Sequence, residues 1–114
     1  MPADDHLYIL WTSSEVDTFD EMVFMYALNA KKLGWWMEVT LIIWGASARL
    51  VGNDELIQLK IKELLSSGIR VEACKACANN LGVEDTLNDL GVDVKYWGQQ
   101  LTTLLKGEKK LITI

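Results

Sequence analysis

Apolar runs alternate with helical periodicities along this chain. Continuous apolar, β-prone runs predict strands at Leu7–Trp11, Glu38–Trp44, Ile69–Ala73, Val92–Trp97 and Lys109–Ile114. The segments between these runs have apolar residues at three- and four-residue spacing, which is typical of helices packed on one side. The pattern is therefore strand–helix repeated four times, followed by a last strand.

Capping residues and glycines set the expected helix ends. Thr18 and Glu21 form a capping-box pattern ahead of the first helix, and Gly34 follows its last turn. Asn53 is the expected cap of the second helix, and Gly68 its stop. The buried stripe of the second helix is predicted to be Leu56, Ile57, Leu64 and Leu65, and Gly45-Ala46-Ser47 is interpreted as a turn. Short helices are expected from about Lys75 to near Gly82, at Glu84–Leu90 and at Gln99–Lys106.

The alternation of strands and helices predicts the fold class. Strand–helix–strand units require right-handed crossovers, which place helices on both faces of a parallel sheet. We therefore expect an α/β fold, a three-layer αβα sandwich with a mainly parallel five-stranded sheet. No linker or repeat divides the chain, so residues 1–114 are expected to form one domain.

Charge and hydropathy exclude several classes of partner. The chain has 114 residues, with 11 Lys and Arg against 16 Asp and Glu, and its net charge is -5. We expect no nucleic-acid partner, because basic residues do not form a stripe and phosphate neutralisation supplies most of that affinity. We also expect no membrane partner, because no apolar run approaches the ~20 residues of a membrane span. The first residues do not resemble a signal peptide, so a cytoplasmic location is expected.

Cys74 and Cys77, the two cysteines of the chain, form a Cys-x-x-Cys pair where the third strand meets a helix. Ligands of open parallel sheets bind at the carboxyl ends of the strands, which is where Cys74 falls. A helix N-terminus stabilises a thiolate, and Lys75 adds a positive charge beside it. The pair is compatible with a redox couple, a sulfur carrier, half of a zinc site or two packed apolar residues. Packing is the favoured interpretation for Cys77, which is one turn into a short helix.

A zinc site fails on the number of ligands. Structural zinc takes four ligands and catalytic zinc three. The chain has two cysteines and one histidine, and His6 begins the first strand, at the opposite end of the sheet from Cys74. We therefore expect no metal, and no Cys–His nucleophile pair. No nucleotide-binding glycine motif is present, so no cofactor is expected.

Other residues at the same predicted edge are candidates for binding. Three tryptophans end strands there, and two interpretations stay open, that they wall a pocket or that they cap the core; they are Trp11, Trp44 and Trp97. Ser13, Ser14 and Ser47 could donate hydrogen bonds, and Arg49 could hold an anionic sulfur species or lie solvated on the surface. Trp35-Trp36, in a turn at the opposite end, suggests a subunit contact, with burial in the monomer as the alternative.

Four short motifs resemble the DsrE/DsrF-like family of sulfur-relay proteins: "TSS" after the first strand, "WGASARLV" after the second, "GIRVEACKACANNLGV" and "LGVDV". The resemblance covers nearly the whole chain. It implies an αβα sandwich that assembles as a homo-oligomer, a trimer or hexamer. It also implies that Cys74 carries a persulfide between donor and acceptor proteins or small thiols. Cys77 matches no required residue of that motif.

Three functions remain open on the sequence. The leading hypothesis is sulfur relay through Cys74, which requires its sulfur to reach solvent. The second is a dithiol/disulfide redox protein that uses Cys74 and Cys77 together. The third is a non-enzymatic oligomeric binding module in which both cysteines lie in the core.

Overall fold

A five-stranded sheet organises the computed structural model, which describes residues 5–114. All four strand pairings are parallel, and the strand order is β4-β3-β2-β1-β5. The strands are β1 (His6–Trp11), β2 (Glu38–Ile43), β3 (Arg70–Cys74), β4 (Asp93–Lys95) and β5 (Lys110–Thr113). The five predicted strands are therefore confirmed, and the sheet is parallel throughout.

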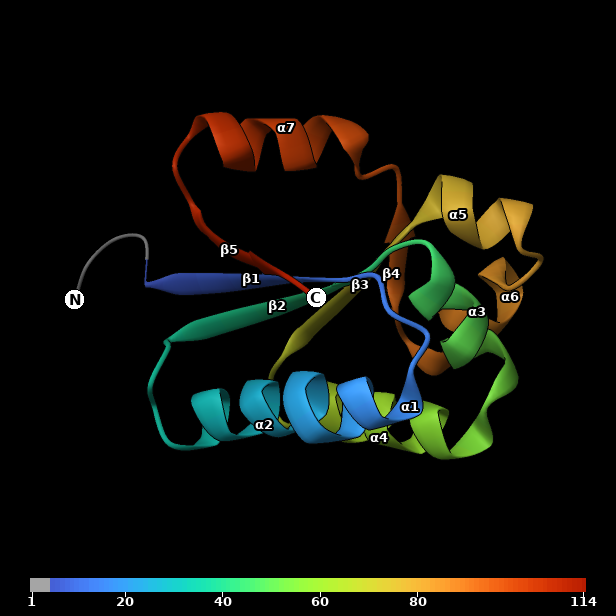
Figure 1. The fold of residues 1–114 in the computed structure, drawn as a ribbon, viewed down its shortest axis with the longest axis horizontal. Coiled ribbons are helices and arrows are strands. Elements are labelled where there is room, and N and C mark those ends of the chain that lie inside the picture. The colour runs from blue at the N-terminus through green and yellow to red at the C-terminus, as the bar shows by residue number, and fades with distance from the viewer. Residues whose placement is uncertain (1–4) are drawn as a thin grey trace.

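Helices cover the sheet unequally on its two faces (Figure 1). One face carries α2 (Met25–Lys32) and α4 (Glu55–Ser66), and α7 (Gly98–Lys106) lies over the other. The short helices α3 (Ala46–Asn53), α5 (Lys75–Asn80) and α6 (Glu84–Leu90) gather beyond the ends of β2 and β3. This arrangement is the predicted three-layer αβα sandwich.

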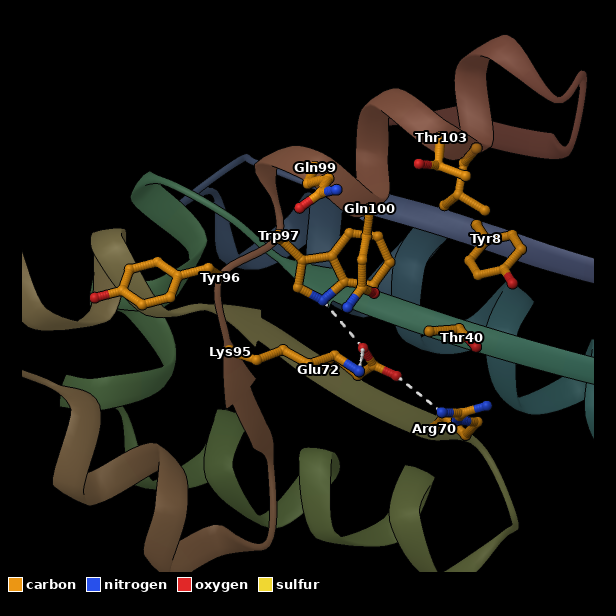
Figure 2. Close-up of a pocket in the computed structure, with 11 residues that line it drawn as sticks. Tyr8, Thr40, Arg70, Glu72, Lys95, Tyr96, Trp97, Gln99, Gln100 and Thr103 are labelled. Atoms are coloured by element: carbon orange, nitrogen blue, oxygen red, sulfur yellow. Dashed lines mark hydrogen bonds and ion pairs between the residues drawn. The ribbon is translucent and has the colours of Figure 1, made fainter.

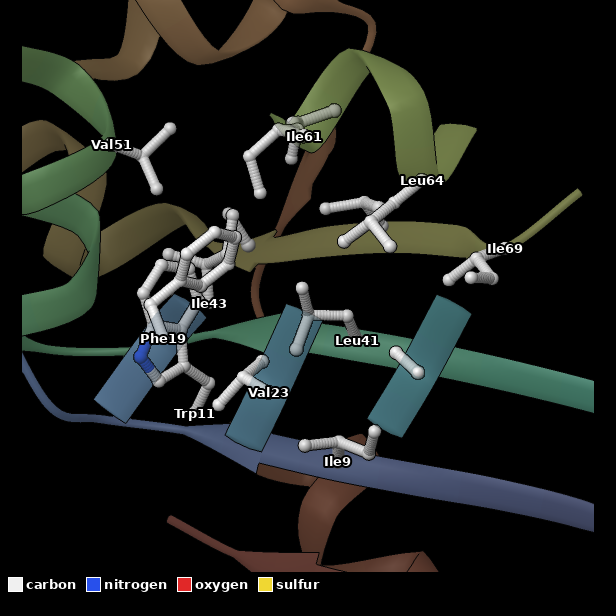
Figure 3. Packing of buried hydrophobic residues seen from close by; sticks show 14 of the residues in the cluster. Ile9, Trp11, Phe19, Val23, Leu41, Ile43, Val51, Ile61, Leu64 and Ile69 are labelled. Atoms are coloured by element: carbon white, nitrogen blue, oxygen red, sulfur yellow. The ribbon is translucent and has the colours of Figure 1, made fainter. Parts of the chain in front are cut away.

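The hydrophobic core lies mainly on the face of the sheet that α2 and α4 cover (Figure 3). Strand residues that point to this side are almost completely buried; among them are Ile9, Trp11, Leu41 and Ile43. A much smaller buried cluster of Ile42, Cys74 and Trp97 lies on the α7 side. No residue of α7 is fully buried, so that face of the sheet is only partly covered.

The first helical segment begins earlier than the capping pattern predicts. It runs from α1 (Val16–Thr18) through a π-helical stretch, η1 (Phe19–Phe24), into α2. Thr18 has helical backbone angles and makes no capping hydrogen bond, so the predicted capping box is wrong. Phe19 explains the earlier start, because its ring is buried against Trp11 and the chain must already be helical to place it there.

Helix α3 was not predicted, because its glycines are typical of a turn. It begins directly after Gly45, so the expected turn is a helix start. Gly52 is required inside this helix, since a Cβ there would lie 2.3 Å from Cγ1 of Val83. Asp54, and not Asn53, caps the next helix α4 by accepting a hydrogen bond from the Ile57 amide.

The buried stripe of α4 is also shifted from the predicted one. Ile57, Ile61 and Leu64 are buried, whereas Leu56 is 71% exposed and Leu65 lies partly buried at the margin. Across residues 5–114, none of the helices combines the length and apolar character that crossing a bilayer requires. The residues before Asp5, on which the signal-peptide interpretation partly rests, lie outside the described region.

Candidate functional site

Cys74 lies at the junction of β3 and α5. It ends the strand, and its extended backbone forms the N-cap of the helix that begins at Lys75. Its side chain is 5% exposed and packs with Ile42 and Trp97 on the α7 side of the sheet. Cys74 is therefore nearly covered, which is less exposure than the sequence-based expectation that its sulfur reaches solvent.

Cys77 is the more accessible of the two thiols. Both cysteines are free, and Cys77 is half-buried. It lines a surface hollow of about 300 Å³ together with residues that follow β2 and end α5: Gly45, Ala46, Arg49, Asn80 and Leu81. Sequence reasoning favoured packing for Cys77, yet this is the thiol that opens toward a ligand-sized space.

The Cys74 thiol affects the protonation of the Cys77 thiol. Burial raises the pKa of the Cys77 thiol above its ordinary value of 9.0, and the neighbouring Cys74 thiol acts in the same direction. A backbone hydrogen bond at Gly45 lowers the pKa and partly opposes these effects. At neutral pH Cys77 is therefore a protonated thiol, which is a weak nucleophile.

The cation that lines the hollow at Cys77 is Arg49 and not Lys75. The Lys75 ammonium lies 3.9 Å from a carboxylate oxygen of Glu84 and 5.7 Å from the centre of the Tyr96 ring. Those contacts hold the Lys75 side chain away from the hollow. Arg49 is exposed and lines the hollow with Cys77, as its sequence position after β2 suggests.

The predicted aromatic wall is only partly present. Trp97 is buried beside Cys74, and Trp44 packs partly buried against the same cluster. Trp11 is in the main core on the opposite face, where its ring centre lies 4.6 Å from that of Phe19. Side chains alternate across a strand, and this alternation places Trp11 on the side away from the thiols.

The candidate serines support the backbone or lie apart. Ser47 is buried and donates a hydrogen bond to the Trp11 carbonyl (2.6 Å), while its oxygen accepts one from the Trp44 amide (3.0 Å). It therefore ties the ends of β1 and β2 together. Ser13 accepts a hydrogen bond from the Glu15 amide, and Ser14 is exposed in the same loop. Neither Ser13 nor Ser14 lines the hollow at Cys77.

A second and larger hollow, of about 380 Å³, lies between the sheet and α7 (Figure 2). Glu72, on β3, lies at its floor and is 3% exposed. The Trp97 indole donates a hydrogen bond to the Glu72 carboxylate (3.0 Å), and the Lys95 ammonium (2.9 Å) and Arg70 guanidinium (3.3 Å) pair with it. The hydrogen bond to Glu72 raises the pKa of Lys95 above 10.5.

The sequence analysis does not single out Glu72, which the structure buries among three partners. One signal was available: Glu72 precedes Cys74 by two residues in a strand, and both must therefore face the same side of the sheet. His6 is at the other end, where its Nε2 lies 2.7 Å from the Thr40 hydroxyl. Within residues 5–114, no group of three metal-ligating side chains comes together.

The fold and the thiol pair define an αβα-sandwich protein with a cysteine-bearing β3–α5 junction. The solved structure of BT1422 from Bacteroides thetaiotaomicron, a conserved protein of unknown function, is 47% identical, with a TM-score of 0.97 over 100% of this chain and 98% of that one. The chain belongs to the same protein family as BT1422.

More distant structures show the same fold. MTH1491 from Methanobacterium thermoautotrophicum, a protein of unknown function, has a TM-score of 0.70 at 16% identity, over 96% of this chain and 98% of that one. The ychN protein from E. coli also has a TM-score of 0.70, at 13% identity, over 96% of this chain and 97% of that one. No protein-family model matches the chain, and no curated protein matches it.

Proposed function

We propose that this protein is a sulfur-relay protein in which Cys74 accepts persulfide sulfur and passes it to an acceptor thiol. The observation that carries the proposal is the position of Cys74 at the β3–α5 junction, beside a second thiol that opens into a hollow with Arg49. The resemblance of "GIRVEACKACANNLGV" to sulfur-relay sequences supports the same assignment. The donors and acceptors would be partner proteins or small thiols.

The proposed reaction is an exchange at sulfur. The Cys74 thiolate attacks the outer sulfur of a donor persulfide, a new S–S bond forms, and the donor leaves as its thiolate. In the second step an acceptor thiolate attacks the outer sulfur on Cys74 and regenerates the Cys74 thiolate. The charge and the number of protons are unchanged in each step, so neither an oxidant nor a reductant is needed.

The surroundings of the thiol pair suit a carrier. The cover of Ile42 and Trp97 shelters a persulfide on Cys74 from water. Because its pKa is raised, Cys77 remains a thiol at neutral pH and attacks that persulfide slowly. The hollow at Cys77 supplies an approach for the donor, and Arg49 favours an anionic sulfur species there.

Persulfide loading followed by intact-mass measurement tests the proposal. After incubation with glutathione persulfide at neutral pH, we expect wild type to gain one sulfur atom. Cys74→Ser should gain none, and the matched control Cys77→Ser should still load. Undiminished loading of Cys74→Ser, or loss of loading in Cys77→Ser alone, would overturn the assignment to Cys74.

A second function, dithiol/disulfide exchange, is favoured by the side-chain contact between the Cys74 and Cys77 thiols. If the pair forms a disulfide, its rate should be low at neutral pH and should rise with pH through and beyond 9.0, because the Cys77 thiolate is the scarce species. Titration against glutathione buffers, with thiols quantified by alkylation, measures the couple. A reversible two-electron couple that requires both cysteines would favour this function over sulfur relay.

We further propose that the protein is a homo-oligomer, a trimer or hexamer, and that it works in the cytoplasm. Apolar side chains on the outer surface support an assembly. Trp35 is 55% exposed beside Met22 and Met25, whereas Trp36 is partly buried and donates a hydrogen bond to the Tyr26 hydroxyl. Of the two tryptophans, Trp35 is therefore the one available for a subunit contact.

A further inference from the structure

We propose that the hollow between α7 and the sheet, built on Glu72, binds a small organic anion that carries a carboxylate or phosphate group. This hollow is distinct from the one at Cys77, with which it shares no lining residue. The proposal concerns a binding site that does not depend on thiol chemistry.

The size and shape of this space fit a small molecule. Its volume of about 380 Å³ lies at the lower end of ligand pockets, which run from roughly 300 to 1,000 Å³. α7 lies over this face of the sheet (Figure 1), and side chains of β2, β3 and β4 line the hollow beside it (Figure 2). The floor is sheet and one wall is helix, so the site is concave and rests on rigid elements.

Charge indicates the sign of the ligand. Two cations, Arg70 and Lys95, line the hollow with one carboxylate, Glu72. Lys95 also pairs with Asp93 outside the lining (3.4 Å), so the exposed Arg70 guanidinium is the cation most available to a ligand. An anion would pair with this exposed guanidinium, whereas a cation would be repelled by it.

Glu72 acts as the internal counter-ion that holds these cations in place. A buried carboxylate is costly unless its lone pairs are satisfied, and here the Trp97 indole, Lys95 and Arg70 satisfy them. The same contacts hold the charged end of each side chain beside the floor of the hollow, although Arg70 stays 59% exposed. The cations are therefore preorganised before a ligand arrives.

Arg70 is the principal anchor. Its side chain is 59% exposed and contacts Glu72 through Nη2. A guanidinium has five N–H donors, so, among the contacts that the described residues make, the donors on Nε and Nη1 remain for a ligand. Their planar fork matches a carboxylate or a phosphate, which is why the two groups share one proposed site.

The rest of the lining suits the uncharged body of the ligand. Polar side chains come from β1 and α7, namely Tyr8, Gln99, Gln100 and Thr103, and Leu104 and Trp97 add apolar surface. Figure 2 shows Gln100 reaching down from α7 beside Trp97, over the Glu72 floor. A ligand with a planar apolar body and one anionic end would use both kinds of lining.

Calorimetric titration of the full chain tests the site, with benzoate, phenyl phosphate and the neutral isostere benzamide as probes. We expect saturable binding of at least one anion and none of benzamide. Which anion binds more tightly distinguishes a carboxylate ligand from a phosphate ligand. Arg70→Gln should weaken binding by about tenfold or more, because a charge-assisted contact is lost. Thermal melts check that this variant, altered at an exposed side chain, stays folded.

Arg49→Gln is the matched control, since Arg49 is the other arginine of the chain and lines the hollow at Cys77. Its affinity for the anion should equal that of wild type. The same titration with Cys74→Ser should also match wild type, so that failure of sulfur relay and failure of this site are distinguishable. Absence of binding by every probe, equal binding of benzamide, or a loss in Arg49→Gln but not in Arg70→Gln would overturn the proposal.

Discussion

Replacement of Trp11 by alanine should lower the free energy of unfolding by about 3–5 kcal/mol, the usual cost of deleting a large buried aromatic side chain. Trp11 is fully buried where the end of β1 packs on Phe19. Its removal leaves a cavity in the main core that the rigid sheet cannot close. Urea denaturation followed by circular dichroism measures the change, with the slope of the transition checked for two-state behaviour.

Trp11→Phe is the informative control. The Trp11 indole N–H is buried without a hydrogen-bond partner among the described residues, which costs about 1–3 kcal/mol in general. Phenylalanine removes that donor and keeps most of the apolar contact, so its destabilisation should be clearly smaller than that of alanine. Persulfide loading should be unchanged in Trp11→Phe, because Trp11 lies on the face of the sheet away from the thiols. An equal destabilisation by Trp11→Ala and Trp11→Phe would contradict this account of how Trp11 packs in the core.

The architecture could be predicted because burial on a parallel sheet produces continuous apolar strands. "LYILW" and "EVTLII" are buried or half-buried along nearly their whole length, so their signal does not depend on distant residues. Helix α3 could not be predicted in this way. Gly52 interrupts its pattern for a tertiary reason, the approach of Val83 from the segment before α6, and local sequence carries no trace of that contact.

The candidate site, like the fold, could be predicted from the sequence only in part. Strand ends could be placed from the sequence, so Cys74, Trp44, Trp97 and Arg49 were expected at the correct edge. Which face each side chain occupies depends on the exact strand register, and this explains why the sequence leaves open whether Trp11 walls a pocket or packs in the core, where the structure places it. The sequence does not reveal the burial of Glu72, because two of its three partners are distant in the chain. Arg70 lies two residues before it, but Lys95 and Trp97 reach it only once β4 pairs with β3.

Substitution at Lys95 should destabilise the protein more than substitution at its partner Glu72. Lys95→Met leaves the Glu72 carboxylate, which is 3% exposed, without its closest cation. We expect a loss of about 2–3 kcal/mol, below the ~3–5 kcal/mol typical of fully buried pairs, because Arg70 and Trp97 remain. Glu72→Gln should cost only about 1 kcal/mol, since glutamine still accepts the Trp97 hydrogen bond and both cations can turn to solvent.

The double variant and the pH dependence of stability separate this ion pair from simple packing. If the penalty in Lys95→Met arises from an uncompensated carboxylate, adding Glu72→Gln should restore part of the lost stability, so the two substitutions should not be additive. The pKa of Lys95 is raised in the folded protein above its ordinary value of 10.5. The stabilisation that charged Lys95 gives to the fold is therefore fully present below pH 10.5, and it is lost as the pH rises through the higher pKa of the folded protein. The wild-type free energy of unfolding should therefore fall in that alkaline range, and the Lys95→Met curve should be flatter there. Additive losses and parallel curves would mean that Lys95 contributes through its hydrocarbon stem and that Glu72 does not organise the cations beneath α7.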